Sequence, residues 1–193
     1  SLEYYIKDAF SNSFTFNDAK KEQTYKKIFS YIADQNHPPD LILNKGDAFE
    51  IKKHEQEKSS LNLNSSAPKP YLYQDKIQDP RLSDECRKCD GGTWRRKEMF
   101  YIIGHVKKNN LKSLFFAHAP TFVSEKNRYL EPWNELRSGI IEIQKNISSS
   151  TVPYKGRELG RLNEVDLRSY TNLRIRGLWT IDNPLKIFES KIS

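Results

Sequence analysis

The sequence predicts an α/β fold in which a mixed sheet of about five strands is flanked by helices. Two observations predict the sheet: residues 39–52 read as a strand, a turn and a second strand, and residues 99–106 and 112–118 form apolar runs typical of buried central strands. Helical spacing of apolar residues before and after these runs predicts the flanking helices. A chain of 193 residues can bury one full core, so we expect one domain over residues 1–193.

The N-terminal elements follow from apolar spacing and from local start and stop signals. Apolar residues recur at helical spacing over residues 2–10, and Asn17 or Asp18 caps a second helix. The Pro-Pro pair at 38–39 ends that helix, because proline excludes helical geometry at the residue before it. The expected N-terminal elements are therefore helices over 2–10 and about 18–34, and strands over about 40–43 and 48–53.

The rest of the chain reads as a long polar loop followed by strands and helices. Residues 55–80 are rich in Ser, Asn and Pro, and long loops in compact domains are usually functional or disordered. Apolar residues on one helical face from Trp133 to Ile143 predict a helix. Alternation of Leu173 and Ile175 with two arginines predicts a last strand. The expected elements after the loop are a helix near 81–89, strands over 99–106 and 112–118, helices over 132–146 and 157–168, and a strand over 171–181.

Charge and composition favour a polyanionic partner. The net charge of +7 and the pI of about 9.3 favour nucleic acid first and a membrane surface second. No apolar run approaches the roughly 18–20 residues of a membrane span, so we expect no bilayer crossing. Two cysteines do not make a secreted disulfide framework, and we expect a reducing, cytoplasmic setting. No signal peptide is visible, and the missing initiator Met leaves open a segment before Ser1.

The strand–turn–strand segment carries the strongest candidate site. Glu50 and Lys52 are two residues apart and point to one face of their strand, and a hairpin brings Asp40 beside them. Two carboxylates suit Mg²⁺, with the Ile51 carbonyl as a further ligand, and the ammonium orients or deprotonates an attacking water. This is the chemistry of phosphodiester hydrolysis. The alternative is an ordinary solvated hairpin, because all three residue types are common on surfaces.

These residues resemble a known motif. Pro39, Asp40, Glu50, Ile51 and Lys52 match the pattern of the PD-(D/E)xK nuclease superfamily. A wider resemblance to the NgoPII-type family of type II restriction endonucleases rests on four segments: Asn-x-Pro-Pro-Asp at 36–40, Lys-Gly-Asp-Ala-x-Glu-x-Lys-Lys at 45–53, Leu-Asn-Ser-Ser-x-Pro-Lys at 63–69 and Arg-x-Arg-Gly-x-Trp at 174–179.

The resemblance implies a restriction-endonuclease-like core and a Mg²⁺-dependent enzyme that cuts double-stranded DNA. The site implied for the family is the short palindrome GGCC, and the implied products carry 5′-phosphate and 3′-hydroxyl ends. A two-fold symmetric site favours a homodimer. Glu3, in a setting similar to that of an early-helix Glu of the superfamily, becomes a further metal-ligand candidate; an ordinary helix-surface Glu is the equal alternative, and Glu22 is a weaker rival.

Two segments are candidates for DNA contacts. The first is the loop over residues 64–69, whose hydroxyl, amide and ammonium groups suit phosphates and base edges. The two strand arginines share one face, so both could enter one groove of DNA and bind guanine edges or phosphates; the equal alternative is a solvated strand face. After this strand, we expect Gly177 to permit a close backbone approach and Trp179 to pack in the core. The DNA-binding candidates are Asn64, Ser65, Ser66, Lys69, Arg174 and Arg176.

Two other functions fit the same residues. A nuclease of the same fold with a role in repair or junction cleavage is one alternative, and a catalytically silent basic DNA-binding module is the other. Cys86 and Cys89 form half of a zinc site, but no second ligand pair has zinc-like spacing, so we expect structural cysteines. His118 lies in an apolar run and reads as a packed core histidine.

Overall fold

The structure is a computed structural model that describes residues 1–34, 37–56, 59–64, 66–147, 158–162 and 173–189. The chain separates into two compact units. Unit 1 comprises Ser1–Ser59, Lys69–Val123 and Asp182–Ser193, and unit 2 comprises Ser60–Pro68 and Ser124–Ile181. The single domain over 1–193 stays a prediction.

Unit 1 is built on a six-stranded mixed sheet, which confirms the predicted fold class. The strand order is β1-β2-β3-β6-β5, and β7 also pairs with β6. Strands β3 and β6 are parallel, and the other pairs of this sheet are antiparallel. The strands are β1 (Phe29–Ile32), β2 (Leu41–Leu43), β3 (Ala48–His54), β5 (Tyr71–Tyr73), β6 (Arg96–Lys107) and β7 (Asn110–His118).

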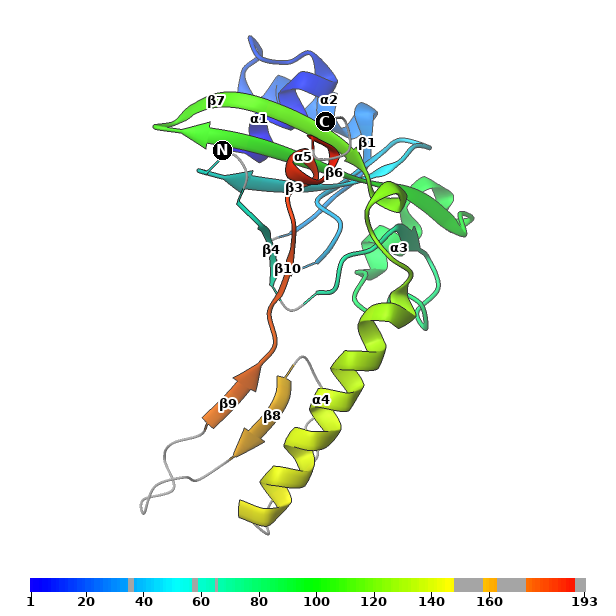
Figure 1. Ribbon diagram of the computed structural model, residues 1–193. Helices are drawn as coiled ribbons and strands as arrows, with labels where there is room; N and C mark the ends of the chain where they lie inside the picture. Colours follow the sequence, from blue (N-terminus) through cyan, green and yellow to red (C-terminus); the bar gives the residue numbers. More distant parts are fainter. Residues whose placement is uncertain (35–36, 57–58, 65, 148–157, 163–172, 190–193) are drawn as a thin grey trace, which may run out of the picture. The chain divides into compact units, whose positions relative to one another are not determined.

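Helices lie on both faces of this sheet (Figure 1). On one face, α1 (Leu2–Ser11) and α2 (Asp18–Ile28) bury Leu2, Ile6 and Tyr25 against Phe49 and Ile102. This packing follows from the apolar spacing of α1 and confirms the first predicted helix.

The opposite face receives α5 (Pro184–Glu189). Its Phe188 ring contacts Phe115, whereas Phe10 at the end of α1 contacts Phe116, and neighbouring strand residues point to opposite faces. The remaining helical segments of unit 1 are α3 (Asp84–Lys88) and the 3₁₀ helices η1 (Cys89–Gly92) and η2 (Ala119–Thr121).

The β2–β3 hairpin has the turn that the sequence predicts. Lys45 adopts a left-handed conformation with φ of 56°. At Gly46 a Cβ atom would lie 2.9 Å from the Leu43 Cβ, so a residue without a side chain fits this close approach. The Gly46 N–H donates to the Leu43 carbonyl at 2.9 Å. The turn therefore connects the two antiparallel strands and sets the register in which Leu41 pairs with Phe49.

Two predictions for unit 1 need correction. The second helix ends at Ile28 rather than near Asp34, because residues 29–32 form β1. Phe29 and Tyr31 are buried on alternate positions and pair with β2, so sheet pairing overrides the helical spacing. The long loop also contains a strand, β5, which pairs with the start of β6.

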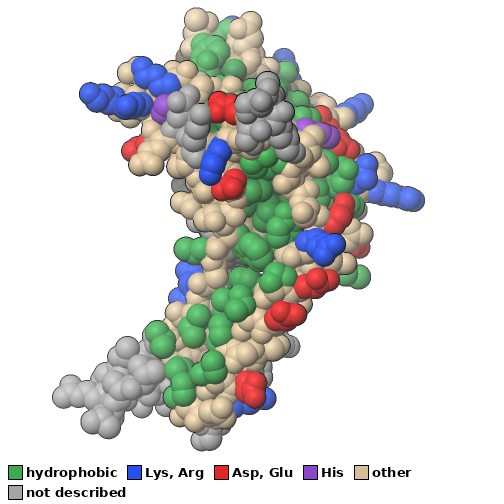
Figure 2. Space-filling view, viewed as in Figure 1, with side chains coloured by type: hydrophobic (Ala, Val, Ile, Leu, Met, Phe, Trp, Pro, Cys, Tyr) green, Lys and Arg blue, Asp and Glu red, His purple; other side chains and the backbone are tan. Residues whose placement is uncertain are grey.

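Unit 2 joins α4 (Lys126–Ile147) to two small strand pairs. The strands are β4 (Leu61–Asn64), β8 (Glu158–Leu162), β9 (Leu173–Arg176) and β10 (Trp179–Ile181); β4 pairs with β10, and β8 with β9. Figure 2 shows hydrophobic side chains gathered where α4 meets the β8–β9 hairpin, with acidic side chains beside them along α4. The close approach predicted at Gly177 is confirmed, because a Cβ there would lie 2.4 Å from the Trp133 ring.

The predicted helix over 157–168 is wrong for residues 158–162, which form β8. Glu158 and Gly160 are buried on alternate positions of this strand, and a Cβ at Gly160 would lie 2.4 Å from Ile140 of α4. The strand therefore lies flat against α4, and residue 157 and residues 163–168 fall outside the described residues. Among the helices that the structure describes, none is long and apolar enough to cross a membrane.

Candidate active site

The β2–β3 hairpin brings the three predicted catalytic side chains together. Because Leu41 pairs with Phe49, the preceding Asp40 comes opposite Glu50. The Lys52 Nζ donates to the Glu50 Oε1 at 2.7 Å. The side chains of Glu50 and Lys52 are 18% and 20% exposed, so this is a mostly desolvated ion pair that is still open to a ligand on one side.

Asp40 is held by the backbone of the neighbouring strand. Its Oδ2 accepts a hydrogen bond from the Ile51 N–H at 2.5 Å. Its own carbonyl accepts from the Ala33 N–H at 2.9 Å, which ties the start of β2 to the end of β1. The carboxylate is therefore positioned by β3, and the Asp40 backbone is held by the residue after β1.

The electrostatics of the site keep an extra proton near neutral pH. Burial raises the pKa of Asp40 to about 7, and the Glu50 charge adds to the rise. Burial alone would lower the pKa of Lys52, but the Glu50 carboxylate outweighs it and raises that pKa above its ordinary value. Lys52 is consequently an ammonium, and Asp40 is the carboxyl group that gains most from an added cation.

The donor set fits a divalent metal. Two carboxylates crowd one another, and their mutual repulsion is what a hard cation with oxygen ligands relieves. Within the described residues, no group of three His, Cys, Asp or Glu side chains is arranged to hold a metal ion. Asp40 and Glu50 would therefore share the ion with backbone oxygen, water or phosphate, which is the usual situation for Mg²⁺.

Glu3 lies near this pair but has its own partner. Its charge is among the influences that raise the pKa of Asp40, so α1 brings it to the same side of unit 1. Its Oε1 accepts from the Lys7 Nζ at 3.1 Å, and the Lys7 side chain is only 8% exposed. Lys7 was missed by sequence reasoning, although its position four residues after Glu3 on a helix was a signal.

Among the predicted loop residues, Lys69 belongs to the unit that carries the site. The Lys69 backbone N–H donates to the Tyr101 hydroxyl at 3.2 Å, and Tyr101 is the β6 neighbour of Glu50. The Lys69 ammonium, however, forms an ion pair with buried Asp79. Ser66 belongs to unit 2, where its N–H donates to the Leu63 carbonyl at 3.3 Å. Ser65 and the Asn64 side chain lie outside the described residues.

The two predicted arginines differ in their surroundings. Arg174 Nε donates to the Glu158 carboxylate, whose side chain is 2% exposed. The second oxygen of Glu158 is buried without a hydrogen bond from the described residues. Arg176 is the strand partner of Glu158 and has an exposed side chain. The structure therefore gives Arg174 a role in holding β9 against β8, and leaves Arg176 facing solvent.

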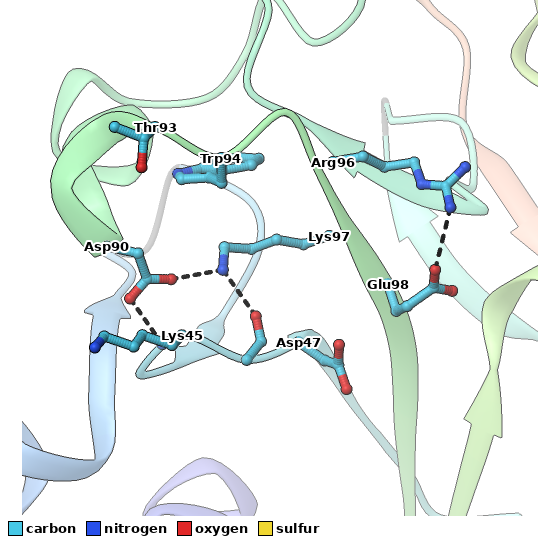
Figure 3. A pocket seen from close by; sticks show the side chains of 9 residues that line it. Lys45, Asp47, Asp90, Thr93, Trp94, Arg96, Lys97 and Glu98 are labelled. Atoms are coloured by element: carbon cyan, nitrogen blue, oxygen red, sulfur yellow. Dashed lines mark hydrogen bonds and ion pairs between the residues drawn. The ribbon is translucent and has the colours of Figure 1, made fainter.

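A second ion pair holds the turn of the β2–β3 hairpin (Figure 3). The Lys97 Nζ donates to Asp90 at 2.6 Å and to the Gly46 carbonyl at 2.8 Å, and Asp90 accepts from the Lys45 N–H at 2.8 Å. Burial acts to raise the pKa of Asp90, but Lys97 and the Lys45 N–H outweigh it and the net shift is downward. These residues border a pocket of about 400 Å³ that also includes Trp94.

The cysteines and His118 have structural surroundings. Cys86 and Cys89 are buried free thiols, and burial raises the pKa of Cys86 to about 12. A purely structural role for the two cysteines stays a prediction. The core assignment of His118 is wrong: its side chain is 39% exposed and contacts the Glu98 carboxylate at 2.8 Å.

Comparison with known proteins adds a family to this geometry. The NgoPII restriction endonuclease family matches residues 1–193. The type II restriction enzyme NgoPII of Neisseria gonorrhoeae is 39% identical over 189 residues, which cover 97% of this chain and 64% of that protein. The chain thus spans just under two thirds of the relative's length. No solved structure matches the chain.

Proposed function

The chain belongs to the NgoPII restriction endonuclease family, and from this premise we propose that it is a type II restriction endonuclease. The reaction is Mg²⁺-dependent cleavage of both strands of DNA at a short palindrome, for which the resemblance implies GGCC. The observation that carries the proposal is the placement of Asp40, Glu50 and Lys52 on one hairpin, with an ion pair of 2.7 Å beside a carboxyl group of raised pKa.

Each residue has a role that its contacts support. Asp40, aimed by the Ile51 N–H, and Glu50 would hold the metal together with the Ile51 carbonyl, and Glu3 is a further candidate. Glu50 also holds the Lys52 ammonium in place, and Lys52 orients the attacking water and offsets charge developing on the phosphate. The bound metal supplies positive charge to the phosphate oxygens and favours ionisation of water.

The two arginines of β9 and the loop residues have separate roles in DNA binding. Arg176, exposed on β9, reads bases or phosphates directly, and Arg174 contributes beside its pairing with Glu158. The loop with Asn64, Ser65, Ser66 and Lys69 completes this part of the proposal.

The quaternary state is a separate part of the proposal. All 193 residues act as one nuclease domain, and two copies act as a homodimer because a palindrome presents two symmetry-related phosphodiesters. Sedimentation with a cognate duplex should show two chains per DNA, and one chain per duplex throughout cleavage would contradict the dimer.

A plasmid digest with and without Mg²⁺ tests the activity. Discrete fragments that require Mg²⁺ are the expected result. Cutting without discrete sites, or only at branched DNA, would instead favour a nuclease of the same fold used in repair or junction cleavage. DNA binding without cutting would favour a silent binding module, against which the intact set of Asp40, Glu50 and Lys52 argues.

A further inference from the structure

Two histidines meet at the end of the catalytic strand. His54 of β3 and His105 of β6 are register partners, and their rings stack with centroids 5.4 Å apart and planes at 24°. His54 follows Lys52 by two residues, so it points to the same face, about 6.6 Å further along the strand. The two imidazoles therefore extend the surface that carries Glu50 and Lys52, within reach of a phosphate next to the one being cleaved.

Each ring is anchored through one nitrogen. The His54 Nδ1 contacts the Gln56 carbonyl, and the His105 Nε2 contacts the Glu55 carbonyl at 3.0 Å. A carbonyl only accepts hydrogen bonds, so both of these nitrogens carry a proton. The remaining nitrogens, Nε2 of His54 and Nδ1 of His105, hold a lone pair in the neutral ring and become N–H donors when the ring is protonated.

The surroundings favour an anion at this pair. Lys52 on the same face adds positive charge, and no three-residue metal cluster occurs in the described part of the chain. Protonated imidazoles and a phosphate attract one another, and the phosphate offsets the repulsion between two stacked cations. The charged residues nearest to the pair in sequence or register are Glu50, Lys52, Lys53 and Glu55 near His54, Lys107 near His105, and Lys112 of β7, next to Ser113, the register partner of His105.

We propose that the His54–His105 pair binds a DNA backbone phosphate flanking the scissile phosphodiester and takes up a proton from solvent when it does so. The proposal rests on the proposed DNA-cleaving function and adds a phosphate site to it. Histidine is the side chain that ordinarily changes charge between pH 5 and 8, so binding through this pair strengthens as the pH falls through that range.

The test is DNA binding measured in EDTA at about pH 6 and about pH 8. All proteins carry Asp40→Asn, because Asp40, with a pKa of about 7, is a second group that titrates in this range. The probe is a short fluorescein-labelled duplex. The double variant His54→Gln/His105→Gln keeps amide N–H donors for the Glu55 and Gln56 carbonyls, and His118→Gln on β7 is the matched control.

The double variant should bind roughly tenfold more weakly than its parent at the lower pH and equally at the higher pH. Its log–log salt dependence at the lower pH should fall by about one for a lost phosphate contact. His118→Gln should match the parent at both pH values. Thermal melting checks folding, and each single variant replaces the double variant if the double variant does not fold.

Equal pH dependence in the parent and the double variant would overturn the proposal, as would an equal loss of affinity at both pH values. Cleavage by the unsubstituted chain is measured separately. If the unsubstituted chain cuts DNA but the variants show either result, only the histidine proposal is refuted. If the chain neither binds nor cuts DNA, the proposed function is refuted.

Discussion

Burial and the nearby Glu50 charge both raise the pKa of the Asp40 carboxyl group. Burial raises its pKa to about 7, with Glu50 adding to the rise, from 3.8 for an exposed carboxyl. Between these two values the folded chain binds a proton that the unfolded chain has released. The free energy of unfolding of the metal-free protein should therefore be highest below about pH 4 for this group and should fall as the pH rises to about 7.

Asp40→Asn should remove this pH dependence. In the unsubstituted chain, the Asp40 contribution should fall on the order of 2–4 kcal/mol between about pH 4 and pH 8. The measurement is urea denaturation in EDTA at several pH values, with the substituted and unsubstituted chains compared. A fall of the same size in both chains would show that Asp40 does not hold the extra proton.

Lys52 should be catalytic rather than structural. Lys52→Ala should lower the single-turnover cleavage rate by two or more orders of magnitude, about 3 kcal/mol in the barrier, because the ammonium no longer orients water or offsets phosphate charge. Lys53→Ala is the matched control, since Lys53 is exposed and points to the other face of β3. If DNA affinity falls as much as the rate, Lys52 is a phosphate anchor instead.

Among the elements, the turn of the β2–β3 hairpin depends on the Asp90–Lys97 pair. Both side chains are nearly buried, at 7% and 6% exposed, and both contact the turn. Lys97→Met should leave Asp90 as an unpaired buried charge and lower the stability by about 3–5 kcal/mol. Arg96→Met, which removes an exposed pair with Glu98, should change stability by at most about 1 kcal/mol. Equal, small effects in urea denaturation would show that the pair does not support the turn.

The two arginines of β9 should separate in experiment. Arg174→Ala leaves buried Glu158 without its partner, so it should lower stability by about 1–3 kcal/mol. Arg176→Ala should leave stability nearly unchanged and bring cleavage of one-mismatch sites closer to that of the cognate site. The measurements are a denaturation midpoint and the ratio of cognate to mismatch cleavage rates. An unchanged ratio with uniformly weaker binding would make Arg176 a phosphate contact.

Sequence patterns predicted the elements whose structure depends on local residues. They failed where pairing with a distant strand determines the structure. The hairpin at 39–52 has its own turn and alternation, and it forms as expected. Residues 29–32 continue a helical spacing, yet they form β1 because β2 offers an open edge. Residues 158–162 resemble a helix by composition, but Gly160 lets the strand lie close against α4. Such long-range contacts leave no local periodicity to detect.

At the scale of the whole molecule, the same limit explains which site residues were found. Asp40, Glu50 and Lys52 are close in sequence, so strand alternation and one turn suffice to join them. His54 and His105 meet only through the parallel register of β3 with β6, which nothing in either segment specifies. The Asp79 partner of Lys69 likewise comes from the far part of the predicted loop. The family matches residues 1–193 of this chain, and the alignment with the relative covers 64% of that protein.

The central claim is that Asp40 and Glu50 make this chain a metal-dependent DNA-cutting enzyme. The most direct measurement is single-turnover cleavage of a duplex in Mg²⁺ by Asp40→Ala, Glu50→Ala and the control Glu98→Ala, a half-exposed carboxylate of β6. We predict that both site variants lose cleavage by more than about a hundredfold while still binding DNA in EDTA, and that the control cuts normally. Near-normal cleavage by either site variant would contradict the account.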